Sequence, residues 1–415
     1  MVMNTVSRGT DISKFKLSYR ERNVGDFPDE LNIVLKKKND LKYGENMHQH
    51  AAMYAMDSIN GHNVSIISRL TNIRYVRTDD KGKGGLSLTN NMDIARAMGC
   101  LKYFGDTPSV VILKHNTVAG FAKQVNHDQT LDGLFRLARD ADLESNFGGT
   151  VVFNKPLDMA SAKALYELKG INPFFVDVLA APGYEEGVLG YIEGQSKNIR
   201  PAEFSSLDKL PKFIGDETHG LLSFKMQENG EMGVQDIFLT RIKTVDDFIL
   251  DPLVYDKKIE PWQPHFIEYY PTPRELDDLV TAWRVNCAGA RSNGIVFVKN
   301  GVTVAVGSGQ VARVYAVKDA IVKGMQKRMD LEGIKYDKLM GIRGYRKLSA
   351  NPFDKAVCAS DAFFPFADSI ELFVRVGVSA VCQPFGSERD VEVIDRANKY
   401  KIAMPATLER CFGHF

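Results

Sequence analysis

Short apolar runs rich in β-branched residues are the feature that most constrains how this chain can fold. Residues 110–113 (VVIL) form the clearest run, and similar runs occur at 151–153, 176–180 and 295–298. Runs of this length and composition predict short strands buried inside a sheet. Segments with helical spacing of apolar residues lie between them, so the chain is predicted to have an α/β fold.

Local signals near residue 272 and residue 300 sharpen this prediction. Thr272, a proline and Glu275 form a strong helix start, because the threonine can cap the helix and the glutamate can reach back to it. Residues 295–298 and 302–306 flank Asn300-Gly301, a pair typical of a type I′ hairpin. A hairpin within an α/β fold predicts a mixed sheet.

The order of the segments predicts two related lobes. Two blocks of alternating strands and helices are separated by a stretch that mixes charge, proline and glycine. A chain of 415 residues is also long for a single core. The predicted division is an N-terminal arm at 1–22, a first lobe at 23–200, an irregular connecting region at 201–270 and a second lobe at 271–415.

The composition excludes several classes of protein. The net charge of +1 gives no indication of a nucleic-acid or membrane surface. No apolar run reaches the roughly 18 residues of a membrane helix, and no signal-peptide core is visible, so a cytoplasmic protein is expected. The five cysteines are scattered without a CxxC pair, and no motif predicts zinc or another transition metal.

Lys114 and His115 are the first candidates for chemistry. They lie where the strand at 110–113 ends and where a polar turn, expected to run to Gly120, begins. Ligands of α/β folds often bind at such strand ends, and a lysine beside a histidine can supply a cation and a base. Taken alone, a Lys-His dipeptide is usually solvent-facing, and its position at the end of a strand is what favours a functional role.

Four other segments are candidates, each with a structural alternative. They are the polar stretch around Tyr43, the glycine-rich turn 307–310 before Arg313, the aromatic loop 361–368 and the tail from Arg410. A glycine-rich turn can bind an anion through its N–H groups, and aromatic side chains can stack on a planar ring. The alternatives are a loop with a core tyrosine, an ordinary turn, a core loop and a frayed chain end.

Taken in order, these segments resemble the aminoimidazolecarboxamide ribonucleotide (AICAR) formyltransferase domain of the bifunctional purine-synthesis proteins. That family's motifs L-R-Y-G-x-N-P-H-Q, K-H, S-x-F-G-G, D-x-x-x-A-P-G-Y-E, S-N, G-x-G-Q-x-x-R, S-D-A-F-F-P-F and R-x-F-x-H all have counterparts here. They begin with LKYGENMHQ at 41–49 and end in the tail at 410–414. The matches extend over nearly the whole chain.

The resemblance implies a fold and an activity. In the family, each lobe resembles cytidine deaminase without its zinc, and the active sites lie at a homodimer interface. The implied reaction transfers the formyl group of 10-formyltetrahydrofolate to the 5-amino group of AICAR. Only forty residues precede the LKYG segment, so the family's inosine monophosphate (IMP) cyclohydrolase domain is expected to be absent and a separate IMP cyclohydrolase to close the ring.

The resemblance also assigns roles to residues. Lys114, as cation or proton donor, His115, as base, and Asn293, which orients the reacting groups, are the implied catalytic residues. The implied substrate-binding residues are Lys42, Tyr43, Asn90, Phe147, Gly148, Asp177, Gln310, Arg313, Phe363, Pro365, Arg410, Phe412 and His414. The family leaves room for a structural monovalent cation, whose ligands the sequence does not assign.

Three positions depart from the family pattern. Lys42 replaces an arginine, so a bidentate phosphate contact becomes a single ammonium group. The residues after His115 are Asn-Thr-Val-Ala-Gly in place of Asn-Pro-Cys-Gly, and Ala312 often corresponds to serine. Lys42 and the altered turn support one alternative, a catalytically weak, AICAR-binding regulatory paralogue. Formyl transfer to another aminoimidazole, or from another donor, also stays open because nothing in the sequence excludes it.

Overall fold

A single ten-stranded sheet runs through the molecule. The computed structural model describes residues 9–21, 25, 27–78, 84–169, 172–258, 260–335 and 348–414. In this part of the chain the strand order of the sheet is β20-β19-β17-β18-β7-β6-β8-β11-β12-β5. The strands in that order are Ala380–Cys382, Val357–Ser360, Ile295–Lys299, Val302–Gly307, Thr117–Lys123, Ser109–Lys114, Gly149–Phe153, Val176–Ala181, Arg200–Glu203 and Arg74–Tyr75.

The sheet is mixed, as predicted. β8, β11 and β12 pair in parallel, as do β19 and β20, whereas the two hairpins β6–β7 and β17–β18 are antiparallel. The predicted strands at 110–113, 151–153, 176–180 and 295–298 are confirmed. The turn after Lys114 was predicted too long, because only His115 and Asn116 form it and β7 begins at Thr117.

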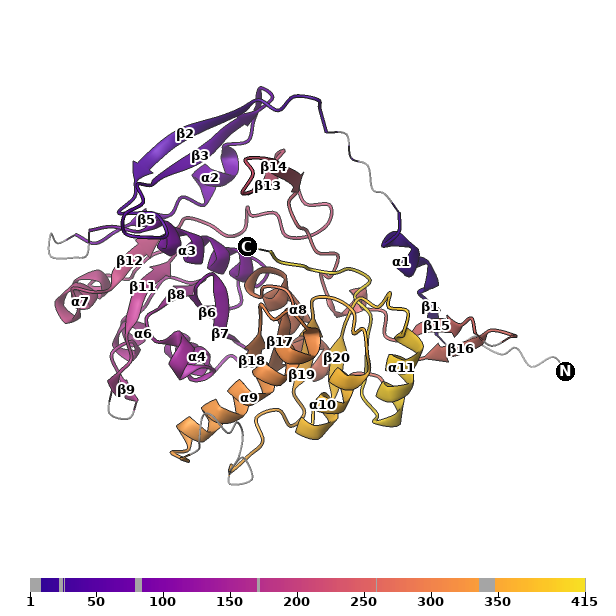
Figure 1. Ribbon diagram of the computed structural model, residues 1–415. Coiled ribbons are helices and arrows are strands. Elements are labelled where there is room, and N and C mark those ends of the chain that lie inside the picture. The colour runs from indigo at the N-terminus through magenta and orange to yellow at the C-terminus, as the bar shows by residue number, and fades with distance from the viewer. Residues whose placement is uncertain are drawn as a thin grey trace.

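Helices cover both faces of the sheet (Figure 1). α3 (Leu88–Leu101) and α8 (Pro273–Gly289) lie side by side on one face, where Val111, Leu113, Val296 and Val298 point. The alternate residues of the same strands point into two cores on the other face. The helices of those cores are α4 (Leu131–Asp140), α6 (Met159–Ala164) and α7 (Val188–Gln195), and then α9 (Arg313–Leu331), α10 (Asp368–Val376) and α11 (Asp390–Lys399).

The two halves of the sheet repeat one order of elements. In the first half α3 is followed by β6, β7, α4, the four-residue α5 (Leu143–Asn146) and β8, and in the second half α8 is followed by β17, β18, α9 and β19. The halves meet where β18 pairs with β7, at Val302 and Ala122. This repeat agrees with two related lobes, whereas the likeness to cytidine deaminase and the lobe boundaries stay predictions. Residues 1–8 and 22 of the predicted arm lie outside the described residues.

Smaller elements surround the sheet. A separate sheet of three strands, β2 (Ile33–Asp40), β3 (Ala52–Ile59) and β4 (His62–Asn63), lies above the first half with α2 (Ile66–Leu70), as Figure 1 shows. β1 (Thr10–Asp11) pairs with β15 (Pro252–Asp256), which pairs with β16 (Gln263–Phe266). The remaining elements are α1 (Ser13–Ser18), α5 (Leu143–Asn146), β9 (Leu168–Lys169), β10 (Asn172–Pro173), β13 (Leu222–Met226), β14 (Met232–Asp236) and η1 (Val245–Asp247).

Candidate functional site

The turn between β6 and β7 presents His115 in a left-handed backbone conformation. His115 and Asn116 have φ angles of 53° and 60°, which residues other than glycine rarely adopt. Together they form the two-residue connection of a tight hairpin. The turn therefore places the backbone of His115, an exposed residue, at the end of the strand.

Lys114 and Asp93 stand on either side of this turn. The Lys114 Nζ donates to the carbonyl oxygen of Phe147 at 2.8 Å. The N–H of Asn116 donates to Asp93 Oδ1 at 2.7 Å, and the Thr150 hydroxyl donates to Asp93 Oδ2 at 3.1 Å. Burial raises the pKa of Asp93, while these two hydrogen bonds and the nearby His115 oppose the rise.

The N-terminus of α3 joins further predicted residues to the turn. Ser87 caps α3 in a reciprocal pair with Asn90, and the Asn90 Nδ2 donates to Asp177 Oδ2 at 3.4 Å. Asp177 also forms an ion pair with Arg200. Because Asp93 lies three residues after Asn90, both side chains lie on the same side of α3.

Lys42 and Tyr43 lie in the loop between β2 and β3 and reach the same end of α3. The carbonyl oxygen of Tyr43 accepts from the N–H of Leu88 at 3.1 Å, and the Lys42 ammonium lies 5.8 Å from the Tyr43 ring centre. Gly148, next to Phe147, has a φ of 72° and donates to the carbonyl oxygen of Phe175. The structure thus gathers a first group at this end of the sheet: Lys42, Tyr43, Asn90, Lys114, His115, Phe147, Gly148 and Asp177.

The other predicted residues form a second group around the start of β17. Asn293 donates from Nδ2 to the Gln310 carbonyl oxygen at 2.7 Å and accepts from Arg313 Nη2 at 2.7 Å. Arg313 is buried and also contacts Ser360 and Asp361. The second group consists of Asn293, Gln310, Arg313, Phe363, Pro365, Arg410, Phe412 and His414.

The C-terminal tail docks on this second group. The Cys411 N–H donates to the Asp361 carbonyl oxygen at 3.0 Å, and Gly413 exchanges hydrogen bonds with Ser292. The Lys225 Nζ of β13 donates to the His414 carbonyl oxygen at 3.0 Å. The tail is therefore anchored, and it carries Arg410 and Phe412 beside the aromatic loop.

The topology brings the two groups to the same end of the strands. Since β7 and β18 are antiparallel neighbours, the start of β7 and the end of β18 lie at the same end of the sheet. Arg96 of α3 spans the lobes there, because its Nε donates to Asn116 Oδ1 and its Nη1 to the carbonyl oxygen of Ala288. Ala288 lies five residues before Asn293.

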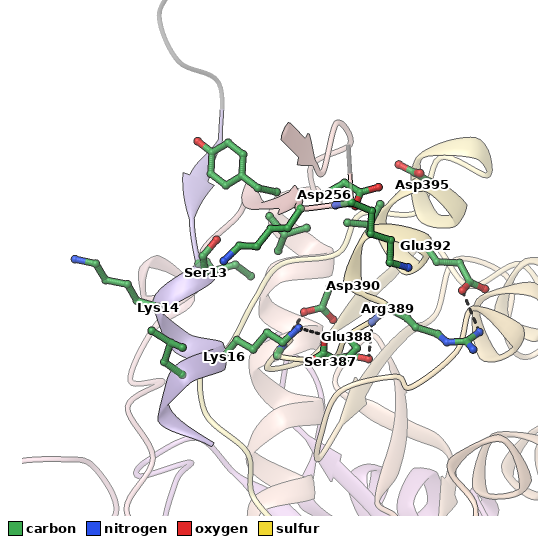
Figure 2. Close-up of a pocket in the computed structure, with 18 of the residues that line it drawn as sticks. Ser13, Lys14, Lys16, Asp256, Ser387, Glu388, Arg389, Asp390, Glu392 and Asp395 are labelled. Carbon is green, nitrogen blue, oxygen red and sulfur yellow. Dashed lines mark hydrogen bonds and ion pairs between the residues drawn. The ribbon is translucent and has the colours of Figure 1, made fainter. Parts of the chain in front are cut away.

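The cavities of the molecule overlap only in part with these groups. A cavity of 450 Å³ borders the second group and is lined by Lys225, Arg291 and His414 among others. A larger one of 920 Å³ lies between α1, β15 and the loop before α11, and none of the predicted residues lines it (Figure 2). Its charged side chains are of both signs, and burial raises the pKa of Asp390 on its wall to about 7.

Neither a metal cluster nor a membrane span is found in the described ranges. Within them, no three His, Cys, Asp or Glu side chains are grouped as metal ligands. In the same part of the chain, no helix has the length and apolar character needed to cross a bilayer.

Asp93, Arg200 and Tyr19 touch the predicted residues although none of the three was itself predicted. The spacing from Asn90 is the sequence signal for Asp93. Arg200 pairs with Asp177 across neighbouring strands of the sheet. Tyr19 reaches the second group from α1, and no local pattern indicates such a contact between distant segments.

Comparisons with known proteins agree with the earlier resemblance. Residues 5–323 match the family model described as AICARFT/IMPCHase bienzyme. The bifunctional purine biosynthesis protein PurH of Chlorobium phaeobacteroides (strain BS1) is 35% identical over 385 residues, 92% of this chain and 60% of that protein. PurH of Persephonella marina is 32% identical over 391 residues, 94% of this chain and 62% of that protein. The chain thus spans about three fifths of these relatives.

Proposed function

Because this chain belongs to the AICARFT/IMPCHase bienzyme family, we propose that it is a formyltransferase of purine synthesis. The proposed reaction moves the formyl group of 10-formyltetrahydrofolate to the 5-amino group of AICAR, giving formyl-AICAR and tetrahydrofolate. The observation that carries the proposal is the pair Lys114 and His115 at the end of β6, where Asp93 holds the turn through the N–H of Asn116, beside Asn90 and Asp177.

The chemistry requires an acid and a base close together. The AICAR amine is a poor nucleophile, because its lone pair is delocalised toward the carboxamide. His115 accepts its proton as the nitrogen attacks the formyl carbon. Lys114 then stabilises the oxyanion of the tetrahedral intermediate or supplies the proton with which N10 departs.

The second group supplies orientation in this proposal. The Asn293 amide is fixed by Gln310 and Arg313, and its Nδ2 carries a second hydrogen that can meet the formyl oxygen. Arg313 acts through Asn293, because its guanidinium is engaged within the chain. Arg410, Phe412 and Phe363 meet the nucleotide, and a homodimer with shared sites remains part of the proposal.

The test is the release of tetrahydrofolate from AICAR and 10-formyltetrahydrofolate by the purified chain. We expect Lys114→Ala and His115→Ala to lower turnover by about 10²–10⁴-fold each. Lys299 ends β17 as Lys114 ends β6, so Lys299→Ala is the matched control and should keep turnover within about twofold. Wild-type turnover no higher than that of Lys114→Ala contradicts the proposal.

The product separates the remaining alternatives. We expect formyl-AICAR to accumulate without IMP, which a separate cyclohydrolase would form. AICAR binding without turnover would favour the regulatory paralogue, for which the lysine at position 42 is the supporting observation. The structural monovalent cation and the cytoplasmic location stay predictions, and no step above depends on either.

A further inference from the structure

The short N-terminal helix α1 is docked on the second lobe. Ile12, just before it, is buried in the core on that side of the sheet, and β1 pairs with β15. The Lys16 Nζ lies 2.6 Å from Glu388 Oε2, and the Tyr19 hydroxyl donates to the Phe385 carbonyl oxygen at 3.4 Å. These contacts dock the helix and place Tyr19, the first residue after it, against the loop before α11.

The Tyr19 ring lies among residues of the second group. It meets the Phe363 ring edge-on, with centres 5.8 Å apart and an interplanar angle of 83°. The Arg410 guanidinium lies 5.4 Å from the Tyr19 ring centre and 4.7 Å from that of Phe412. Arg410 is therefore in contact with two aromatic rings, one from each end of the chain.

The loop before α11 is shaped to admit this ring. A Cβ atom at Gly386 would lie 2.5 Å from Tyr19 Cε2, and Gly386 has a φ of 103°. Burial also raises the pKa of the Tyr19 phenol to about 12, so the phenol carries no charge near neutral pH. An uncharged ring stabilises a neighbouring guanidinium without neutralising it.

Arg410 itself is suited to an anion. It is exposed, and its guanidinium lies against the Tyr19 and Phe412 rings. A guanidinium in contact with rings can still donate its N–H groups in the plane, and this planar fork matches a phosphate. Ring contacts reduce the number of orientations that the long side chain must lose on binding.

We propose that Tyr19 is a positioning residue that holds Arg410 for the phosphate of the nucleotide substrate. This inference rests on the proposed function for the identity of the anion. It adds a residue from outside the two sheet halves to the site, and it gives α1 a part in substrate affinity. The ring, and not the hydroxyl, does the positioning.

The experiment compares Tyr19→Ala, Tyr19→Leu and Tyr19→Phe in the full chain. We expect Ala and Leu to raise the KM for AICAR by about 3- to 30-fold, the range of a cation–π contact, with kcat and the KM for the folate little changed. Phe should behave as wild type. Tyr19→Leu keeps apolar volume without a π face, so it tests the inference even if Tyr19→Ala folds poorly.

Calorimetric binding supplies a readout that separates positioning from folding. Loss of the Tyr19 ring should weaken AICAR but leave the affinity for the unphosphorylated riboside unchanged. Tyr400→Ala is the control, because Tyr400 also lies under a cation, the Lys399 ammonium at 5.5 Å, but outside the second group.

The outcomes distinguish this inference from the proposed function. Unchanged AICAR affinity in Tyr19→Leu, equal losses for AICAR and the riboside, or a loss in Tyr19→Phe as large as in Tyr19→Ala overturns the role of Tyr19 while the enzyme reaction stands. A wild-type chain that neither binds nor turns over AICAR overturns the proposed function first.

Discussion

The turns β6–β7 and β17–β18 occupy equivalent places in the two halves and are built differently. Each follows a helix that begins with a capping box, Ser87 with Asn90 in α3 and Thr272 with Glu275 in α8. Each helix then carries an aspartate that accepts an N–H from a turn residue 23 positions later, Asp93 from Asn116 and Asp278 from Gly301. The shared frame makes the differences interpretable.

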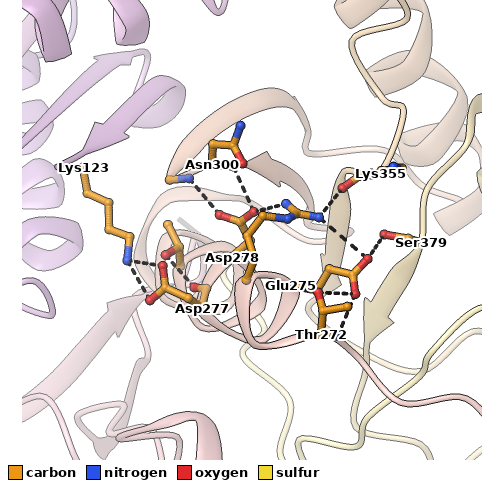
Figure 3. A network of polar contacts seen from close by, with 11 residues as sticks. Lys123, Thr272, Glu275, Asp277, Asp278, Asn300, Lys355 and Ser379 are labelled. Atoms are coloured by element: carbon orange, nitrogen blue, oxygen red, sulfur yellow. Dashed lines mark hydrogen bonds and ion pairs between the residues drawn. The ribbon is translucent and has the colours of Figure 1, made fainter. Parts of the chain in front are cut away.

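The second turn is built for stability. Asn300-Gly301 is a preferred type I′ pair, and Asp278 accepts from both turn N–H groups, at 2.9 Å and 2.8 Å. Asp278 also pairs with Arg274, and Asp277 pairs with Lys123 of β7, as Figure 3 shows. The Asp278 carboxylate is buried, so we assign this turn a purely structural role.

The first turn gives up part of that stability to present a histidine. His115 and Asn116 adopt left-handed φ angles where the second turn has Asn300 and Gly301. Glycine takes this conformation without steric cost and asparagine tolerates it, whereas other residues pay up to about 1–2 kcal/mol. Asp93 receives one turn N–H, is only half-buried and faces His115. The comparison teaches that the same arrangement of helix and hairpin has a structural role in one half of the sheet and forms a candidate active-site turn in the other.

Converting the first turn into the second should have the largest effect. We expect the double variant His115→Asn with Asn116→Gly to lose about 10²–10⁴-fold in formyl transfer. The same variant should match wild type or gain up to about 1 kcal/mol in the free energy of unfolding, since both left-handed positions become easier while Arg96 loses its Asn116 acceptor. Turnover assays and urea unfolding measure the two effects, and retained activity would show that the turn is not catalytic.

Removing the carboxylate of Asp278 in α8 should lower the stability of the chain more than removing that of Asp93 in α3. Asp278→Ala leaves two backbone N–H groups without their acceptor and removes one of the partners of Arg274, so we expect a loss of about 2–5 kcal/mol in the free energy of unfolding. Asp93→Ala should lose less, about 1–2 kcal/mol, because one turn N–H is involved. If urea unfolding showed equal losses of stability for Asp278→Ala and Asp93→Ala, the proposed difference between the two turns would be wrong.

A single methyl group tests the turn backbones. A Cβ at Gly301 would lie 2.5 Å from Val125 Cγ2, at a φ of 74°, so Gly301→Ala should cost about 1–3 kcal/mol. The reciprocal change, Asn116→Gly, relieves the left-handed φ but removes the acceptor of Arg96 Nε, so it should be neutral or stabilising by less than about 1 kcal/mol. Thermal unfolding of the two variants checks the signs, and a stabilised Gly301→Ala would contradict the geometry.

The pH dependence should show the smallest effect. Burial raises the pKa of Asp278 above its ordinary value of 3.8, so the folded chain holds this proton more tightly than the unfolded chain does. The stabilising contribution of the protonated carboxyl is present below about pH 4 and is lost as the pH rises through the raised pKa. Relative to wild type, Asp278→Asn should therefore become more stable between pH 4 and pH 7, and an opposite trend in its melting temperature would contradict the burial argument.

The sequence predicts the second turn better than the first for physical reasons. The cap at Thr272 and the pair Asn300-Gly301 are local signals, and both are confirmed. The hairpin at His115-Asn116 was missed because neither residue is a glycine and the polar residues continue into β7. Tyr19 was missed because its partners lie more than 300 residues away, where only the fold brings them together.

The pairing of β7 with β18 joins the two halves of the sheet and can form only late in synthesis. The Phe121 N–H donates to the Thr303 hydroxyl between these two strands, and the two residues are 182 positions apart. A ribosome adds about 5–20 residues each second, so the edge of β7 waits roughly 10 to 40 seconds for its partner. For that time the nascent first lobe has an open strand edge, which is the kind of surface that chaperones shield and that aggregating chains join.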